Sequence, residues 1–582
     1  MKFKKALSVA VAAALSGAFA LSGLACGGDD TWSMPKNTEK YDIPQDYCRT
    51  YYEVFVRSFA DGNGDGIGDI KGLINNLDYL NDGDDSTMDD LGINGIWMMP
   101  INSSPSYHKY DVTDYYNIDD EYGTLEDFDE LVKECNKRNI WLQMDLVLNH
   151  TSSRHPWFTE AVADANNGLE PDQSEAMQRY IFVHKDDVPT SGTYRKVAGS
   201  SDYYYLGNFD SGMPDLNLAN TEVREEIKKI VDFWLERGVR SFRLDAVPWA
   251  CANDVIYSEE NAEFWTWFND YCNEKGAEIY GKEGDGIARY CYNVGEVWAD
   301  NNTVVNYFGT GMSNFNYGYD GGTANSGFAQ VANAQASRAI AANLVNNMAN
   351  TQAAALAKDP DAILSNFLTN HDNDRLSAMF GSAAKLKSAA SLYMLMPGNC
   401  YIYYGDEIGA KGTGDDPSRR LPFNWGDGRY NIKNPPGANY DGNQDYGTVS
   451  GQKNSADSIL TYYRYVVQMR NRFPEIARGK MTAYAVDNGG ELATSEKVRE
   501  NLGTNSITTV NEYNRNVAAY TLTWNGKTLL LVHNFGSEAT IGVSAFGGYG
   551  IAGTLLAGGG SIKLESGKLT LPSNSVAVLR AS

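Results

Sequence analysis

The chain has 582 residues, and its 49 Lys and Arg against 74 Asp and Glu residues give a formal net charge of −25. This surplus of negative charge argues against a nucleic-acid-binding protein, because nucleic acids need a basic face that displaces their counterions. A content of 42% hydrophobic and 21% charged residues is typical of a globular protein with a large core. We expect a monomer with more than one domain.

Residues 1–25 have the parts of an export signal. Three lysines in the first five residues precede an apolar run, Ala6–Leu21, that is too short to span a membrane stably. Two cleavage sites stay open: Ala18–Ala20 suits an ordinary signal peptidase, whereas Leu24–Cys26 resembles a bacterial lipoprotein box. The sequence therefore predicts a secreted protein or a cell-surface lipoprotein anchored at Cys26, with a polar tether over residues 26–47.

Strand-like apolar runs alternate with helical stretches along the next 350 or so residues. The expected strands are Tyr51–Phe59, Gly95–Pro100, Trp141–Val147, Ser241–Val247, Tyr292–Val297, Ile363–Leu368 and Cys400–Tyr404, with a weaker eighth strand near Phe315. Apolar residues at helical spacing predict a helix over Thr221–Glu236. This alternation predicts an α/β fold, a (β/α)8 TIM barrel with its chemistry at the carboxyl ends of the strands.

Two regions depart from a plain barrel. Segment 151–216, after the third strand, is too long for a simple loop, so we expect a small inserted domain B there. Residues 479–582 alternate in the manner of strands, and the hairpin signal Trp524–Lys527 indicates a C-terminal all-β sandwich domain. The barrel itself is then expected over residues 48–150 and 217–478.

Charged side chains stand at the expected strand ends. Arg243 and Asp245 point to the same side of their strand, so the guanidinium should keep this carboxylate ionised. Glu296 follows its strand among apolar residues, a setting that would raise its pKa and suit it to proton donation. One ionised and one protonated carboxyl group are the minimum apparatus of glycoside hydrolysis.

The segments that carry these residues resemble the conserved regions of the α-amylase family, glycoside hydrolase family 13. They are SYHKYDVTDYY (Ser106–Tyr116), DLVLNH (Asp145–His150), FRLDAV (Phe242–Val247), GEVW (Gly295–Trp298) and FLTNHD (Phe367–Asp372). The resemblance covers residues 48–480 and implies that Asp245 is the nucleophile, Glu296 the general acid/base and Asp372 the stabiliser of the transition state. It also implies contacts to the sugar by His108, Tyr110, His150, Arg243 and His371.

Two further segments bear on the subgroup and the substrate. Met213–Asn217 is similar to the form found in the group intermediate between oligo-1,6-glucosidases and neopullulanases, and Ala246 is similar to the residue of α-1,4-acting members. Many amylases follow the nucleophile with a Lys-His pair that contacts the leaving part of the glucan. Here Pro248 and Trp249 hold these places, which leaves those contacts open and offers Trp249 as a stacking surface.

Oxygen-bearing side chains alternate with glycines in the segment Asp61–Asp69 (DGNGDGIGD). Such a pattern suits Ca²⁺, which takes oxygen ligands from a tight turn. The segment resembles the calcium loop of oligo-1,6-glucosidase-like members, which implies Asp61, Asn63, Asp65, Asp69 and the Ile67 carbonyl as ligands. A solvated turn built on Asx side chains is the alternative.

Together these features predict a secreted α-amylase that hydrolyses internal α-1,4-glucosidic bonds of starch, glycogen and maltooligosaccharides. Configuration would be retained through a covalent glycosyl-Asp245 intermediate. The alternatives are an α-glucan transglycosylase or a maltooligosaccharide-degrading α-glucosidase, and a catalytically inactive glucan-binding protein. The presence of Asp245, Glu296 and Asp372 argues against the inactive protein.

Overall fold

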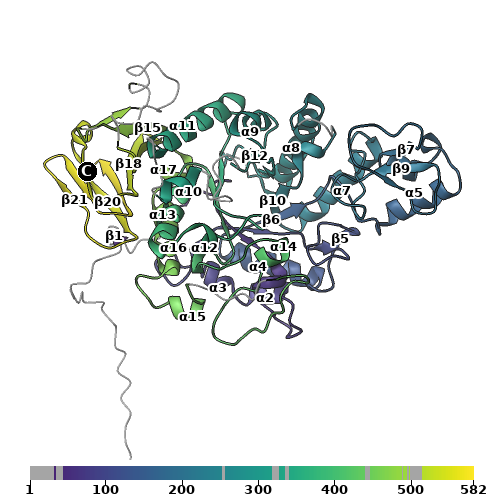
Figure 1. Ribbon diagram of the computed structural model, residues 1–582, viewed down its shortest axis with the longest axis horizontal. Coiled ribbons are helices and arrows are strands. Elements are labelled where there is room, and N and C mark those ends of the chain that lie inside the picture. Colours follow the sequence, from purple (N-terminus) through teal and green to yellow (C-terminus); the bar gives the residue numbers. More distant parts are fainter. Residues whose placement is uncertain are drawn as a thin grey trace, which may run out of the picture.

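A computed structural model of the protein describes residues 32–33, 43–251, 256–282, 284–316, 327–333, 340–439, 446–487, 489–494, 497 and 514–581. The predicted signal peptide, Cys26 and most of the predicted tether lie outside the described residues. Figure 1 shows a central barrel between a C-terminal β region, in yellow, and a segment inserted in the barrel, in blue.

Eight parallel strands form the barrel (Figure 1). In sheet order they are β12 (Ser313–Asn314), β11 (Val294–Gly295), β10 (Val239–Leu244), β6 (Trp141–Leu146), β3 (Gly95–Met98), β2 (Thr50–Val54), β14 (Asn399–Tyr403) and β13 (Ser365–Phe367). A parallel bridge between Phe315 and Ser365 joins the two ends of this order and nearly closes the sheet. The predicted TIM barrel is confirmed.

Buried aromatic side chains fill the inside of the barrel. The rings of Tyr51 and Tyr401 stack with their centroids 4.8 Å apart, and Trp97 packs against Phe315 at 5.4 Å. All four residues are at most 3% exposed. Because the interior is packed, functional groups can reach a ligand only from the strand ends and the loops that follow them.

Helices cover the outside of the barrel (Figure 1). The longer ones are α4 (Leu125–Lys137), α7 (Thr221–Glu236), α8 (Glu259–Tyr280), α9 (Asn301–Phe308), α11 (Ile340–Lys358), α13 (Ala383–Met394) and α16 (Ile459–Arg472). The shorter ones are α1 (Val56–Phe59), α2 (Ile70–Ile74), α3 (Leu77–Leu80), α10 (Gly327–Ala332), α12 (Leu376–Met379), α14 (Asp416–Arg419), α15 (Val449–Gln452) and α17 (Glu475–Arg478). Helix α7 has the predicted bounds, and the side chain of Asn220 caps its first turn. Across the described residues, every helix is too short or too polar to be a candidate membrane span.

The first strand is shorter than the sequence predicts. Strand β2 ends at Val54, and the rest of the expected segment Tyr51–Phe59 turns into the one-turn helix α1. All four residues of α1 are buried. Because the strand and the helix are equally buried, the apolar pattern of the sequence does not show where the strand ends.

The segment inserted after β6 has its own small sheet. It contains α5 (Pro156–Asn166), α6 (Glu175–Gln178) and an antiparallel sheet in the order β7 (Phe182–His184), β9 (Tyr203–Leu206) and β8 (Tyr194–Lys196). An antiparallel bridge between His150 and Asp215 ties the end of the segment to its start. The segment therefore leaves and rejoins the barrel at one place, beside the carboxyl end of β6.

The C-terminal region consists of two antiparallel sheets, as predicted. The larger has the order β1 (Trp32–Ser33), β20 (Tyr549–Leu556), β23 (Ser575–Ala581), β18 (Lys527–Asn534), β17 (Val517–Trp524), β15 (Lys480–Val486) and β16 (Leu492–Thr494). The smaller has the order β19 (Ala539–Gly542), β22 (Lys568–Leu571) and β21 (Lys563–Glu565), and both sheets contribute to one apolar core. The predicted hairpin joins β17 to β18, with φ of 48° at Asn525 and 73° at Gly526. Strand β1, from the segment expected to be a tether, pairs with β20.

Candidate active site

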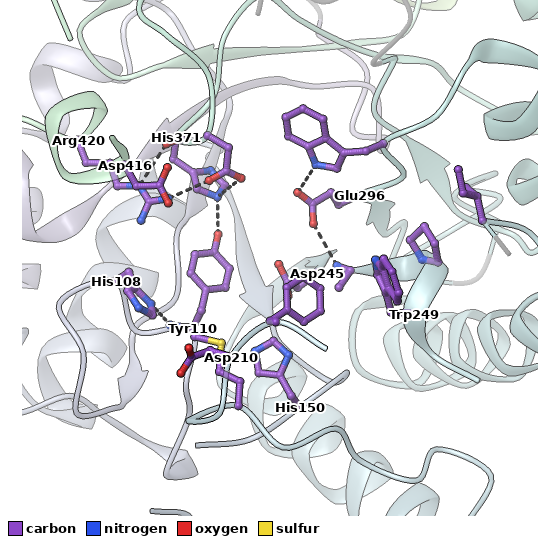
Figure 2. Close-up of a pocket in the computed structure, with 17 residues that line it drawn as sticks. His108, Tyr110, His150, Asp210, Asp245, Trp249, Glu296, His371, Asp416 and Arg420 are labelled. Carbon is purple, nitrogen blue, oxygen red and sulfur yellow. Dashed lines mark hydrogen bonds and ion pairs between the residues drawn. The ribbon is translucent and has the colours of Figure 1, made fainter. Parts of the chain in front are cut away.

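A cavity of about 620 Å³ lies at the carboxyl ends of the barrel strands. It is lined by seven of the residues that the sequence predicts to act on a sugar, namely His108, Tyr110, His150, Asp245, Glu296, His371 and Asp372. The eighth, Arg243, is 1% exposed and contacts the cavity-lining carboxylates. The structure thus brings all eight together. In Figure 2, Asp245 and Glu296 lie between His371 and Arg420 on one side and Trp249 on the other.

Strand register explains why the carboxylates meet. Leu244 of β10 is paired with Gly295 of β11, so the next residues, Asp245 and Glu296, leave neighbouring strands at the same level. After Asp245 the chain turns sharply, because Ala246 has a φ of 51°, in the left-handed region. The backbone N–H of Ala246 then donates to Glu296 Oε2 at 3.1 Å. The turn therefore holds the second carboxylate beside the first.

One guanidinium is shared by three carboxylates. Arg243 Nη1 lies 2.6 Å from Asp245 Oδ1 and 2.9 Å from Asp145 Oδ1, and its Nη2 lies 2.9 Å from Glu296 Oε1. Asp145 also accepts hydrogen bonds from Tyr110 and from the indole of Trp97. Asp145 belongs to the segment DLVLNH, but the sequence does not predict it as a site residue. It pairs with Arg243 in the register of β6 and β10, which explains its ion pair with that guanidinium.

The setting of Glu296 differs from the apolar one expected from the sequence. Besides Arg243 and the N–H of Ala246, the indole of Trp298 donates to Glu296 Oε1 at 2.8 Å. Neighbours that look apolar in the sequence can thus still bring a donor to a carboxylate. Trp298 is itself 49% exposed, so this donor stands at the mouth of the cavity.

Because three carboxylates share the guanidinium of Arg243, the ionisation of Asp245 differs from the one expected from the sequence. Burial raises the pKa of Asp245 to about 8; Arg243 lowers it, and the charges of Glu296 and Asp145 oppose Arg243. The sequence suggested that Arg243 alone would keep Asp245 ionised, but this cation is divided between three anions. Below about pH 8 the cluster around Arg243 therefore retains a proton, which is what a site with one acid and one nucleophile requires.

Two basic residues hold Asp372. His371 Nε2 lies 3.1 Å from Asp372 Oδ2, and Arg420 Nη2 lies 2.8 Å from Asp372 Oδ1. Burial would raise the pKa of Asp372, but His371 and Arg420 lower it well below its usual range. Asp372 is therefore an anion under ordinary conditions. No motif in the sequence points to Arg420, which directly follows the short helix α14.

His108 and Tyr110 come from a loop between β4 (Asn102–Ser103) and β5 (Asp114–Ile118). The backbone N–H of Tyr110 donates to His108 Nδ1 at 3.1 Å, so Nε2 is the nitrogen of His108 that carries the proton. Burial lowers the pKa of His108. A neutral ring with an N–H at Nε2 can donate a hydrogen bond to a ligand hydroxyl.

His150 is a second neutral histidine in the cavity. Burial lowers its pKa to about 4. Its Nε2 is buried and has no hydrogen-bond partner among the residues that the structure describes. A ligand hydroxyl would satisfy this atom.

An apolar rim lines one side of the cavity. It consists of Phe209, Trp249, Ile256 and Trp298, which are 47%, 39%, 49% and 49% exposed. Among the described residues, only one other large apolar side chain, Ile551, is exposed, and it belongs to the C-terminal region. Exposed apolar surface gathered at one cavity indicates a ligand-binding surface. Trp249, offered by the sequence as a stacking surface, is part of it.

The predicted calcium loop Asp61–Asp69 lies outside the cavity. The carboxylate of Asp61 accepts from the N–H groups of Gly64 and Gly66, and that of Asp69 accepts from Gly62 and Gly72. Within the described ranges, no group of three or more His, Cys, Asp or Glu residues is placed to hold a metal ion. The donors nonetheless fit Ca²⁺ in kind, because carboxylate, amide and carbonyl oxygens alternate along a turn in which two of the four glycines, Gly64 and Gly66, have a φ of 89°.

Comparison with known proteins identifies close similarities. The family model for the catalytic domain of alpha-amylase matches residues 53–479. The "Alpha-amylase 3" of Dictyoglomus thermophilum is 34% identical over 76% of this chain and 80% of its own, and the "4-alpha-glucanotransferase" of Thermotoga maritima is 29% identical over 74% and 89%. The solved structure of "Eubacterium rectale Amy13B" covers 93% of this chain and 97% of its own, with 35% identity and a TM-score of 0.80.

Proposed function

Since the chain belongs to the α-amylase family of retaining glycoside hydrolases, we propose that it is an α-amylase that cleaves internal α-1,4 bonds of starch, glycogen and maltooligosaccharides. The carrying observation is the bridge that Arg243 makes between Asp245 and Glu296. One nitrogen of the guanidinium contacts each carboxyl group, so the two groups lie close together. Retention requires this proximity, with a separation of about 5–5.5 Å.

The proposed reaction has two displacements. Asp245 attacks the anomeric carbon, the bond to the leaving sugar breaks, and Glu296 gives a proton to the leaving oxygen. Glu296 then takes a proton from water, whose oxygen displaces Asp245. Asp372, kept anionic by His371 and Arg420, stabilises the positive charge that develops on the sugar ring in both steps.

Neutral and charged donors would hold the sugar at the point of attack. His108 and His150 present neutral rings to the cavity, and His371 lies across from them next to Tyr110. Glu296 and its partner Trp298 stand on the side of the apolar rim. We therefore assign the rim to the leaving part of the glucan, whose sugar rings have apolar faces that pack on aromatic side chains.

Transglycosylation is the second candidate activity. An apolar rim favours a sugar acceptor over water, and the glucanotransferase of Thermotoga maritima is similar over most of the chain.

Two further proposals rest on sequence motifs alone. We propose that Met213–Asn217 marks the group intermediate between oligo-1,6-glucosidases and neopullulanases. We also propose that the protein is exported and then either released or anchored at Cys26.

We further propose that the loop Asp61–Asp69 binds Ca²⁺. The side chains of Asp61, Asn63, Asp65 and Asp69 and the carbonyl of Ile67 would hold the ion. Asp61 and Asp69 are buried and already organise the loop through its backbone N–H groups. Calcium would stabilise the chain after the first barrel strand, and it takes no part in the proposed bond cleavage.

Product analysis over time on soluble starch, pullulan and maltotriose tests the function, with Asp245→Asn as the blank. An endo-acting hydrolase releases mixed maltooligosaccharides from starch early in the reaction. Products longer than maltotriose, formed from pure maltotriose, would instead establish the transglycosylase. If no product depends on Asp245, the protein is a glucan-binding scaffold and the proposal is wrong.

A further inference from the structure

The imidazole of His371 lies between two carboxylates from different parts of the barrel. Glu53, on strand β2, places Oε1 2.7 Å from His371 Nδ1 and 3.3 Å from the backbone N of the same residue. Asp372 places Oδ2 3.1 Å from Nε2. The side chains of Glu53 and His371 are each 1% exposed. A buried glutamate that lines no part of the cavity thus fixes both the ring and the backbone of a residue that does.

The hydrogen bonds around this ring show where its protons sit. Burial raises the pKa of Glu53, and the contact with His371 and the charge of Arg243 lower it. With the proton of the pair on the imidazole, the Glu53 carboxylate accepts and Nδ1 carries the proton. On the other side, the hydroxyl of Tyr110 donates to Asp145 Oδ2 at 3.1 Å, which leaves its oxygen, 2.7 Å from Nε2, as an acceptor. Asp372 is a second acceptor at Nε2. Both ring nitrogens therefore face acceptors, as in an imidazolium.

Charge in the surroundings agrees with this geometry. Burial lowers the pKa of His371, but Asp372 and Glu53 raise it to about 10. The other charged, titratable and aromatic groups that face His371 or Glu53 from the packed elements are Asp145, Arg243, Tyr110, Trp97, Arg420, Arg375, Tyr403 and Asp406.

We infer that Glu53 is a positioning residue that holds His371 as a cation with its Nε2–H directed toward Asp372 and the sugar-binding end of the cavity. Without the charge of Glu53, the ring would be neutral near pH 8 and could point either a donor or a lone pair at the ligand. The identity of that ligand rests on the proposed function, whereas the charge of His371 in the free protein does not.

The test is Glu53→Gln, which keeps the shape of the side chain and removes its charge. His371 is followed by NMR in histidine-labelled protein without substrate, and its signal is assigned by its loss in His371→Asn. We expect wild-type His371 to stay protonated at pH 8 and His371 in the variant to lose its proton about 2–3 pH units below the pH at which the wild-type residue does. We also expect kcat/KM on maltooligosaccharides at pH 8 to fall about 10- to 100-fold, with a smaller loss at pH 5.5, where the ring is protonated again.

Glu407→Gln is the matched control. Glu407 is also fully buried beside a barrel strand, but it accepts from the hydroxyls of Tyr52 and Tyr79 rather than from His371. Its loss should lower thermal stability without moving the titration of His371. An unchanged His371 titration in Glu53→Gln, or an equal shift in Glu407→Gln, would overturn the inference. So would a wild-type His371 that loses its proton below about pH 7, a result that needs no variant to fold.

Discussion

The two sides of the cavity are built in opposite ways. On the charged side, Arg243 and His371 are each 1% exposed, and the carboxylates of Asp245, Glu296 and Asp372 each have at least one basic partner. On the apolar rim, Trp249 and Trp298 are 39% and 49% exposed and stand at the mouth. In Figure 2 Arg420 and Trp249 mark these two sides, with Asp245 between them.

This difference separates chemistry from recognition. Fixed, buried charges need no rearrangement when charge develops in a transition state, so the charged side can act on the rate of bond cleavage. Exposed apolar side chains contribute favourable free energy only when a ligand covers them and removes them from water. The rim can therefore act on binding and on the choice of acceptor. Substitutions on the two sides should therefore change different kinetic constants.

The largest effect is expected for Asp245→Asn. Loss of the nucleophile should lower kcat on starch by at least about 10⁴-fold, with little change in thermal stability, because the amide has the same size. The control is Asp406→Asn, another buried aspartate beside the carboxyl end of a barrel strand, which lies near Arg375 and lines no part of the cavity. It should lower the melting temperature but keep activity within about tenfold. Equal losses of activity in both variants would contradict the assignment.

Glu296→Gln should lower kcat on starch by about 10²- to 10⁴-fold, the usual contribution of a general acid. The loss should be much smaller in the first step on a nitrophenyl α-maltoside, whose leaving group needs no proton. A pre-steady-state burst of nitrophenol followed by slow turnover is the measurement. If the two substrates lose activity equally, Glu296 does not act as the acid.

The pH dependence should show the proton that the Arg243 cluster retains. Because burial raises the pKa of Asp245 to about 8, the cluster loses its proton as the pH rises through that value. The site then lacks an acid, so kcat/KM should fall on the alkaline side with a midpoint near pH 8. A flat profile to pH 10 would show that the proton is held elsewhere.

Trp249→Ala should act on the opposite side of the cavity. Loss of one stacking surface costs about 0.5–1.5 kcal/mol, or roughly a 2- to 12-fold rise in KM for maltooligosaccharides. Cleavage of a nitrophenyl α-glucoside, which places only a small ring on the rim, should change less, and chain-lengthened products should decrease. Trp157→Ala, an aromatic change in the inserted segment away from this cavity, serves as the control. An equal fall in kcat on all substrates would place Trp249 in the catalytic machinery instead.

The sequence predicted the barrel and the members of the site better than it predicted their ionisation. Periodicity and spacing sufficed for strands such as β6 and for helix α7, because each buries one continuous apolar pattern. The end of β2 was missed because α1 is equally buried. Residues that act through another side chain were also not predicted. Glu53 is a single polar residue within a strand, and Arg420 directly follows the short helix α14, so neither belongs to a pattern that predicts a function.

Ionisation depends on contacts that the sequence does not order in space. Adjacency predicted that Arg243 would serve Asp245 alone, yet Asp145 and Glu296 approach the same guanidinium from neighbouring strands. Likewise, Trp298 counts as an apolar neighbour of Glu296 in the sequence, yet its indole N–H donates a hydrogen bond to that carboxylate. Register and side-chain direction decide such contacts, and only the folded chain fixes both.

The calcium loop should give the smallest effect on catalysis, because none of its residues lines the cavity. Bound Ca²⁺ stabilises the folded state by about 2.7 kcal/mol at a hundred times its dissociation constant. Removing it with a chelator should therefore lower the melting temperature by about 5 °C and leave kcat at 25 °C within about twofold. Asp61→Asn should have the lower melting temperature with and without calcium, since it loses both a ligand and the hydrogen bonds that shape the loop. If the melting temperature of the wild-type protein does not respond to calcium, the loop is the alternative, a turn held by its own Asx side chains, and does not bind the ion. The architecture of the two sides of the cavity does not depend on that outcome.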